Sequence, residues 1–318
     1  MAPSVSYVVT LYNKVPYLPY LLAGLEAQSG DIGKEFIFVD DGSTDGTVRM
    51  LRDMTSGWKN VVVIEQANAG PASATNNGLK IAQGDYIKPV DGDDMLAPWA
   101  TAYLLEALNA TGCDVALGDM GLQGRYASQR PVQEVMGSFK TGMADFAAEP
   151  DFLRKAFKNA QTNPTAWLAK RSLVEKTKGC DELIFIQDYS IELRLGYHGK
   201  VVRVRNELFK MPDAAPGRLS DQEAQILHDV NLALLRFIET HPDLAPDLAH
   251  YGVSRAASRA WAWARRHERA NYFSKPFLLS IAAKLKLATP GSALQRAACE
   301  PFRNNTRLRI VDPSRAAA

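Results

Sequence analysis

Three carboxylates stand within four residues in Asp91-Gly92-Asp93-Asp94, directly after a short extended segment, residues 86–90. Carboxylates this close raise one another's pKa unless a cation compensates them or water solvates the turn. Mg²⁺ or Mn²⁺ is a cation of the required kind, because it takes carboxylate oxygens together with the phosphates of a ligand. The pattern predicts a metal and phosphate site here, and an ordinary solvated acidic turn is the alternative.

Alternating apolar patterns indicate the elements that would position this segment. Short β-branched and aromatic runs, typical of buried strands, lie before Asp91 and at Val5–Thr10, Phe36–Val39 and Val61–Glu65. Helical spacing of apolar residues separates them, at 17–28 and at 72–83, and recurs after the acidic segment at 99–110. This alternation predicts an α/β fold with a doubly wound, mainly parallel sheet.

Polar residues follow three of the predicted strands, in the segments 10–14, 40–45 and 91–94. In doubly wound sheets, ligands bind beyond the carboxyl ends of the strands. We therefore expect the three segments to converge on one edge of the sheet. Isolated acidic turns would not produce such a convergence, so the sequence favours a binding site over a solvated turn.

The composition limits the classes of function. A chain of 318 residues with 46% hydrophobic residues and a formal net charge of +2 is typical of a globular protein with no general affinity for polyanions. Its cysteines, odd in number and without CxxC spacing, suggest neither disulfides nor zinc. We find no secretory leader pattern and no apolar run long enough to span a bilayer. These features predict a cytoplasmic protein. The three cysteines are Cys113, Cys180 and Cys299.

Five segments, in this order and spacing, resemble the inverting family-two glycosyltransferases, which have the Rossmann-like GT-A fold. They are Val5–Lys14, Phe38–Thr47, Asn68-Ala69-Gly70, Gly84–Ile87 and Asp91–Asp94, with Gln187-Asp188 further along. The resemblance implies a hexosyltransferase-type enzyme that moves a sugar from a nucleotide-diphosphate donor, most simply a UDP-sugar. It also implies a saccharide or lipid-linked acceptor and a role in the synthesis of cell-envelope or surface polysaccharide.

The resemblance gives the acidic segment a role. Asp91 and Asp93 match the family's DxD motif, and Asp94 lies beside them, so these residues would hold Mn²⁺ or Mg²⁺ and contact the donor. The metal would neutralise the charge that develops on the leaving diphosphate. Which of the three carboxylates binds the metal directly is left open by the motif.

The resemblance also implies a pocket for the base and ribose of the donor. Thr10, Tyr12, Asn13 and Asp41 belong to the matching segments. A tyrosine ring can stack on a base, and a carboxylate can accept a hydrogen bond from an imino N–H, which favours uracil or thymine over cytosine. For Tyr12, the alternative is an aromatic side chain packed at the rim. Asp40 is expected to be structural, as a hydrogen-bond acceptor in the Gly42–Asp45 turn.

Inversion requires a base that takes the proton of the acceptor hydroxyl. Asp188 matches the family's acidic residue in this role. The alternative is an aspartate that caps the helix that follows it, and one residue can serve both purposes.

Two departures from the family pattern concern the donor. Thr75 stands where the family commonly has an arginine, with Lys80 or Lys88 as substitutes. A later family segment with a histidine is matched only in part by Phe209–Pro212 and Arg218–Ser220, and the histidine is missing. Lys210 and Arg218 could still contact the diphosphate, or they are ordinary surface cations.

We expect a GT-A catalytic domain at residues 1–220, with a donor half at 1–118 and an acceptor half at 119–220. Residues 221–318 are predicted to form a helical, basic region. Within 255–315, 13 basic residues face 3 acidic ones, and aromatic residues are interleaved. This composition suggests peripheral contact with the inner face of a membrane. The alternative is a helical appendage with solvated arginines, and no nucleic-acid-binding fold accompanies the charge.

Two other functions fit the same fold. A nucleotidyltransferase would need a glycine-rich, basic phosphate loop after the first strand, which Leu11–Lys14 does not provide. A scaffolding or nucleotide-binding module without catalysis is suggested by Thr75 and by the missing histidine.

Overall fold

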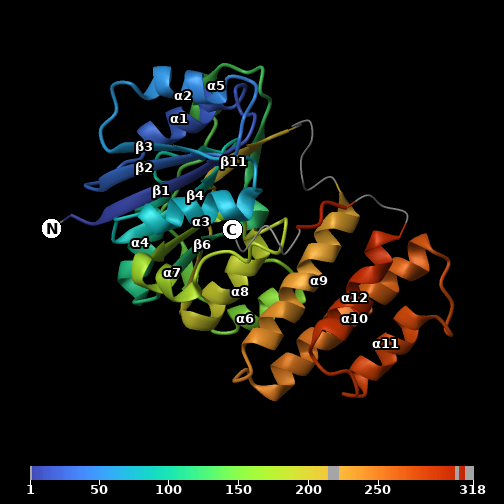
Figure 1. Cartoon of the computed structure of the whole chain (residues 1–318). Helices are drawn as coiled ribbons and strands as arrows, with labels where there is room; N and C mark the ends of the chain where they lie inside the picture. The colour runs from blue at the N-terminus through green and yellow to red at the C-terminus, as the bar shows by residue number, and fades with distance from the viewer. Residues whose placement is uncertain (1, 214–221, 305–307, 312–318) are drawn as a thin grey trace. The chain divides into compact units, whose positions relative to one another are not determined.

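The computed structural model describes residues 2–213, 222–304 and 308–311. The chain forms two compact units, whose elements are labelled in Figure 1. The first consists of Met1–Pro150, Thr162–Cys180 and Leu195–Pro216. The second consists of Asp151–Gln161, Asp181–Arg194 and Gly217–Ala318.

An eight-stranded sheet forms the centre of the first unit, in the order β3-β2-β1-β4-β9-β6-β10-β8. Strands β1 to β4 are mutually parallel where they pair, whereas β9 is antiparallel to β4 and β6. The predicted α/β fold with a mainly parallel sheet is therefore confirmed. The strands are β1 (Ser4–Leu11), β2 (Gly33–Asp40), β3 (Val61–Glu65), β4 (Tyr86–Asp91), β6 (Val115–Gly118), β8 (Phe146–Ala148), β9 (Trp167–Lys170) and β10 (Val201–Val204).

Helices cover both faces of this sheet. On one face, α1 (Leu18–Glu26) and α4 (Ala100–Thr111) bury apolar residues of the face that carries Val5, Tyr7 and Val9. On the other face lies α3 (Pro71–Ile81), whose Gly78 packs so tightly that an added Cβ would lie 2.4 Å from Val8. The core thus comes from strand runs that are apolar on both sides, as parallel sheets require. The first unit also contains α2 (Thr47–Thr55), α5 (Val132–Gly137) and α7 (Arg171–Thr177).

A second, three-stranded sheet has the order β5-β11-β7. It consists of β5 (Met95–Leu96), β7 (Gly124–Tyr126) and β11 (Phe209–Pro212). Because β5 begins directly after the acidic segment, this sheet fixes the chain on that segment's carboxyl side.

The second unit is helical. It holds α6 (Phe152–Lys158), the start of α8 (Asp188–His198), and the carboxy-terminal helices α9 (Glu223–Thr240), α10 (Pro246–His267), α11 (Lys275–Lys284) and α12 (Ser292–Arg303). Ala260 and Trp263 of α10 and Phe302 of α12 form part of its core. The predicted helical character after residue 220 is confirmed for the described residues. Among them, no helix is long and apolar enough to cross a membrane.

Candidate donor site and catalytic base

Strands β1, β2 and β4 bring the predicted polar segments to one edge of the sheet. Thr10 pairs with Val39 of β2 on one side and with Asp91 of β4 on the other. Leu11 pairs with Asp40. The convergence expected from the parallel alternation is therefore present.

Asn13 joins the loop that follows β1 to the loop that follows β2 through hydrogen bonds. Its backbone has a φ of 53°, a left-handed conformation that asparagine tolerates. Its N–H donates to Ser43 Oγ at 2.8 Å, and its Oδ1 accepts from the Thr44 N–H at 2.8 Å. Asp40 accepts from the Ser43 N–H at 2.8 Å, which confirms its expected structural role. Tyr12 lies between Asn13 and Leu11, the last residue of β1, and 46% of its surface is exposed.

The Asp41 carboxylate is buried and carries three hydrogen bonds. Oδ1 accepts from Gln66 Nε2 and from the Ala69 N–H, both at 2.8 Å, and Oδ2 accepts from the Gly70 N–H at 2.9 Å. All three donors thus come from the segment 66–70. Asp41 therefore fixes the loop 66–70 beside the sheet edge, in addition to any contact with a base.

The acidic segment is a tight turn packed on the end of β1. The Asp94 N–H donates to the Asp91 carbonyl at 3.0 Å. Gly92 is required for this packing, because a Cβ there would lie 2.6 Å from the Thr10 carbonyl oxygen. The absence of a side chain therefore lets three carboxylates gather at the edge of the sheet.

The carboxylates of the turn differ in their surroundings. Asp93 is partly exposed, and its Oδ2 accepts from Lys14 Nζ at 2.7 Å in an ion pair. Asp94 is 3% exposed, and its Oδ2 has no hydrogen-bond partner among the described residues. Burial, followed by the charges of Asp91 and Asp93, raises the pKa of Asp94 well above its ordinary value. Asp93 is thus the accessible member with an ion pair, and Asp94 favours its neutral form.

Buried polar groups support the turn. The Thr165 hydroxyl accepts from the Asp91 N–H at 2.9 Å and donates to the Asp94 carboxyl. Tyr126 donates from its hydroxyl to the Asp93 carbonyl at 2.6 Å. Lys88 is fully buried, and its ammonium donates to the carbonyls of Pro89 and Thr165. Burial lowers the pKa of Lys88 to about 7, against the opposing effect of Asp94 and Asp91. Lys88 therefore acts inside the protein, not as an exposed substitute for the family arginine.

The turn fits a divalent cation that shares its coordination with a ligand. No group of three His, Cys, Asp or Glu side chains suited to a metal occurs in the part of the chain that the structure describes. Mg²⁺ commonly binds through one or two carboxylates and completes its shell with water and substrate phosphates. Asp93 and Asp91 can supply such a pair. Asp94 suits the role less, because its carboxyl is buried and favours the neutral form.

The cations proposed near the diphosphate have other environments. Lys210 is buried in β11, where its Nζ lies 3.2 Å from Glu207 Oε1 and donates to the Ser138 carbonyl at 3.1 Å. Arg218 lies outside the described residues. Thr75, which replaces the family arginine, is buried in α3.

Asp188 lies in the second unit, as the first residue of α8. Its Oδ1 is buried and has no hydrogen-bond partner among the described residues. Burial raises the pKa of Asp188 to about 6, with Asp229 adding to the rise and the N–H groups of Asp188 and Tyr189 opposing it. A carboxylate with this pKa is ionised at neutral pH and basic enough to take a proton.

A buried chain of hydrogen bonds supports the segment that leads to Asp188. Asp229 of α9 accepts from the Ile186 N–H at 2.9 Å through Oδ2, and its Oδ1 lies 2.7 Å from His228 Nδ1. Arg303 Nε donates to His228 Nε2 at 3.0 Å. The arginine bond leaves the proton of a neutral His228 on Nδ1, directed at Asp229. The carboxy-terminal helices therefore fix the backbone two residues before Asp188.

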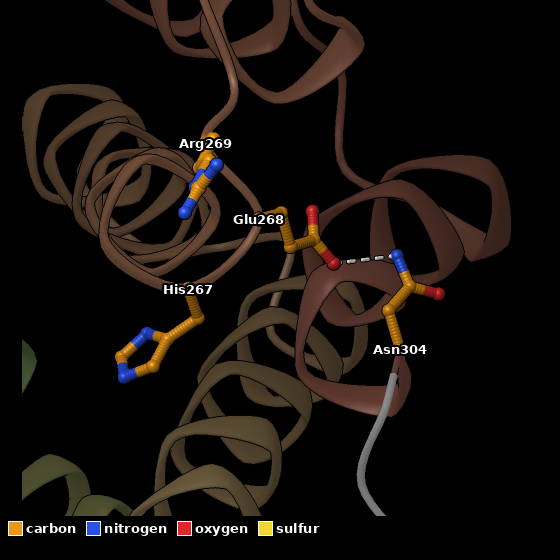
Figure 2. Close-up of a pocket in the computed structure, with 4 residues that line it drawn as sticks. All are labelled: His267, Glu268, Arg269 and Asn304. Atoms are coloured by element: carbon orange, nitrogen blue, oxygen red, sulfur yellow. Dashed lines mark hydrogen bonds between the residues drawn. The ribbon is translucent and has the colours of Figure 1, made fainter.

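Two surface pockets contain none of the predicted site residues. One, of about 550 Å³, is lined by His267, Glu268, Arg269 and Asn304 in the second unit. Figure 2 shows that Glu268 points to Asn304, whose Nδ2 donates to Glu268 Oε1 at 2.7 Å. The other, of about 310 Å³, includes Lys34 and Phe36 near the amino end of β2 and so lies at the opposite edge of the sheet.

Lys14, Tyr126 and Thr165 contribute to the acidic turn but were not named as site residues, although Lys14 lies in the predicted segment 10–14. Lys14 had a usable signal, since it is a cation in the loop that follows the first strand. Tyr126 and Thr165 come from segments with weak periodicity and no motif, so only the folded structure shows their contacts.

Comparison with protein families and solved structures agrees with this fold. Residues 6–130 match the family model described as Glycosyl transferase family 2. A poly(ribitol-phosphate) beta-glucosyltransferase of Bacillus spizizenii is 34% identical over 125 residues, which are 38% of this chain and 20% of that protein. The similarity to this relative thus spans only a fifth of the relative's length.

Solved structures are similar over nearly the whole chain. Staphylococcus aureus TarS 1-349 in complex with UDP-GlcNAc has a TM-score of 0.57 at 18% identity, over 95% of this chain and 92% of that one. The mannosyltransferase PcManGT from Pyrobaculum calidifontis, in complex with GDP-Man and Mn²⁺, has a TM-score of 0.58 at 17% identity. That similarity covers 96% of this chain and 89% of PcManGT. At these identities the similarity establishes the fold.

Proposed function

The chain belongs to glycosyl transferase family 2, and from this premise we propose that it is an inverting, hexosyltransferase-type enzyme that uses a UDP-sugar. The family assigns transfer of a sugar from a nucleotide-sugar donor. The observation that carries the proposal is the register of β1 with its neighbours, which puts Thr10 between β2 and Asp91 at the carboxyl edge of the sheet.

We assign the donor side to this edge. Asp93, with Asp91, would hold Mn²⁺ or Mg²⁺, and the metal would neutralise charge on the departing diphosphate. Asp94 and Thr165 support the turn from inside. The solved complex of PcManGT, a protein of the same fold, with GDP-Man and Mn²⁺ supports a metal.

Tyr12 is proposed to stack on the base of the donor, because its ring is partly exposed at the end of β1. Thr10 and Asp41 would line the ribose and base, with Asn13 keeping the two loops together. Binding of UDP-GlcNAc by TarS, which shares the fold, supports uridine as the nucleoside. Lys210 and Arg218 remain candidates for diphosphate contact, Lys210 only if its ammonium leaves Glu207.

Asp188 is proposed as the base that takes the proton of the acceptor hydroxyl. Its pKa of about 6 suits this step at neutral pH. The acceptor is proposed to be a saccharide or a lipid-linked polymer of the cell surface, since one relative is named for glucosylation of poly(ribitol-phosphate). All three cysteines are buried thiols, which suits a reducing compartment, and we propose the cytoplasm as that compartment.

The test combines nucleotide binding with turnover. Calorimetry should show that UDP binds more tightly with Mn²⁺ than without it, and a panel of nucleotide-sugars should reveal one that is hydrolysed or transferred. Asp93→Asn should remove the metal-dependent part of UDP binding. Asp53→Asn, at an exposed aspartate of α2, serves as the matched control and should leave binding unchanged.

Two results would reject this assignment. Absence of UDP binding with or without metal would favour a scaffolding module. Full turnover in Asp93→Asn would show that the acidic turn does not hold the donor.

A further inference from the structure

Helix α11 and the residue that ends it present three large apolar side chains to solvent, whereas Phe277 packs against Trp261. Leu278, Ile281 and the C-cap residue Leu285 follow one another at positions i, i+3 and i+7, so they form one stripe along the helix and its end. Their exposed fractions are 56%, 37% and 64%. The buried residues of α11 are the small Ser280 and Ala283. This is the reverse of the usual arrangement, in which a helix buries its leucines.

The stripe continues beyond both ends of the helix. Phe273 precedes α11 and is 88% exposed, and Leu287 follows it and is 73% exposed. Single exposed apolar residues are ordinary, but a contiguous set marks a surface that contacts another apolar phase. We call residues 272–287 the α11 surface.

An aromatic cluster holds this surface in place. The ring of Trp261 in α10 lies 5.1 Å from that of Phe277 and 5.9 Å from that of Tyr272. The rings of Tyr272 and Phe277 are 5.1 Å apart. The exposed stripe is therefore anchored on α10 by neighbouring side chains and does not depend on burying its own leucines.

The sequence segment around the stripe carries only positive charges. Between residues 269 and 299 there are five basic residues and no aspartate or glutamate. At 100° per residue, Lys275 and Lys284 lie on either side of the leucine stripe, and Lys286 follows the helix. An apolar stripe with lysines along both sides matches the acyl boundary and the headgroups of an anionic bilayer. The five basic residues are Arg269, Lys275, Lys284, Lys286 and Arg296.

We propose that the α11 surface is a peripheral docking site for an anionic lipid bilayer, in which Phe273 and the stripe insert and the flanking lysines bind headgroups. This narrows the membrane contact predicted for residues 255–315 to one helix and its ends. The proposal does not depend on the donor site, because its measurement uses no nucleotide.

Flotation of the full chain with lipid vesicles tests the proposal. With phosphatidylcholine vesicles that contain phosphatidylserine, the wild type should float, and with pure phosphatidylcholine it should float much less. Leu278→Ser/Ile281→Ser/Leu285→Ser should weaken the binding by about tenfold or more, because the insertion of apolar area is lost. Lys275→Gln/Lys284→Gln/Lys286→Gln should weaken binding to the anionic vesicles by at least about tenfold and reduce its dependence on salt.

The matched control removes three exposed apolar residues of the first unit. Met54→Ser/Leu122→Ser/Met143→Ser should float like the wild type, since these side chains are 40%, 48% and 92% exposed but lie outside the α11 surface. All variants change exposed residues, so their thermal unfolding should stay close to that of the wild type.

The proposal is overturned if the wild type stays with the unbound protein on anionic vesicles, or if the serine variant floats as well as the wild type. It is also overturned if sedimentation without lipid shows a dimer that the serine variant dissociates. In that case the stripe contacts a second copy of the chain and not a bilayer.

Discussion

Asp93 in the first unit and Asp188 in the second are the same residue type in opposite surroundings. Asp93 is partly exposed and carries an ion pair with Lys14 at 2.7 Å. Asp188 has a buried oxygen without a partner among the described residues, and its pKa is raised to about 6. The surroundings of Asp93 favour the binding of a cation, whereas those of Asp188 favour the acceptance of a proton. Environments that separate two carboxylates in this way assign them different chemical roles.

The supports of the two aspartates differ as well. Around Asp93, loops that follow neighbouring parallel strands meet because the sheet register brings them together. The segment before Asp188 is fixed instead by Asp229, a residue of a carboxy-terminal helix. The loops around Asp93 thus come from motifs that are local in sequence, although Tyr126 and Thr165 support the turn from distant segments. The segment before Asp188 depends on packing between distant parts of the chain.

Substitution of Asp188 should have the largest effect on catalysis. Asp188→Asn keeps the size of the side chain but removes the base, so turnover should fall by about 10²- to 10⁴-fold. Affinity for UDP and Mn²⁺ should not change, because donor binding is assigned to the first unit. Single-turnover kinetics and calorimetry measure the two quantities. A turnover within a few fold of the wild type would exclude Asp188 as the base.

The assignment of Asp188 as the base also predicts how kcat/KM depends on pH. The base acts only when it is deprotonated, so kcat/KM should rise with pH up to about 6 and level off above it. Below that pH the rate should fall by about tenfold per pH unit. In Asp188→Asn this ascending limb should be absent from the residual activity.

Asp229 should have an intermediate effect, through the backbone before Asp188. Asp229→Asn weakens the acceptor of the Ile186 N–H and leaves His228 and Gln225 with an imperfect partner in a buried site. A loss of about 1–3 kcal/mol in the free energy of unfolding is expected. Asp229 also raises the pKa of Asp188, so its neutralisation should move the ascending limb of kcat/KM to lower pH.

The pH readout separates a positioning role from a purely structural one. Asp243→Asn, in the turn before α10, is the control and should not move the limb. If the limb of Asp229→Asn stays in place, the residue acts on stability alone.

The sequence predicts the donor edge of the sheet well because short, local sequence patterns determine the strands that form it. Strand β3 matches its predicted bounds at Val61–Glu65, and β1, β2 and α3 differ from theirs by a few residues. Each buried strand is a short apolar run that ends at a polar loop, and parallel pairing brings these loops together. Asp40 could be read as structural because its turn contains the serine that it accepts from.

The sequence predicts less where distant contacts decide. The antiparallel strand β9 at Trp167–Lys170, between β4 and β6, is not among the strands predicted from the sequence. Lys88 looks like a cation available to a ligand, but it is fully buried. Neither the pairing of a strand with non-sequential neighbours nor the burial of a lysine beneath an acidic turn has a signal in the local pattern.

Substitution of Lys14 should have the smallest effect. It tests whether the Lys14 ammonium competes with a divalent metal for the Asp93 carboxylate. The ammonium occupies Asp93 Oδ2, so a divalent metal must compete with it or lie beside a like charge. The pair is partly exposed, with 23% and 15% of the side-chain surfaces accessible, which limits it to about 1 kcal/mol. Lys14→Gln should therefore bind Mn²⁺ about fivefold more tightly in the absence of nucleotide. Lys59→Gln, at an exposed lysine of the same unit, should match the wild type. Titration of Mn²⁺ by calorimetry decides the matter, since weaker binding in Lys14→Gln would mean that Lys14 orders the acidic turn for the metal and does not compete with it.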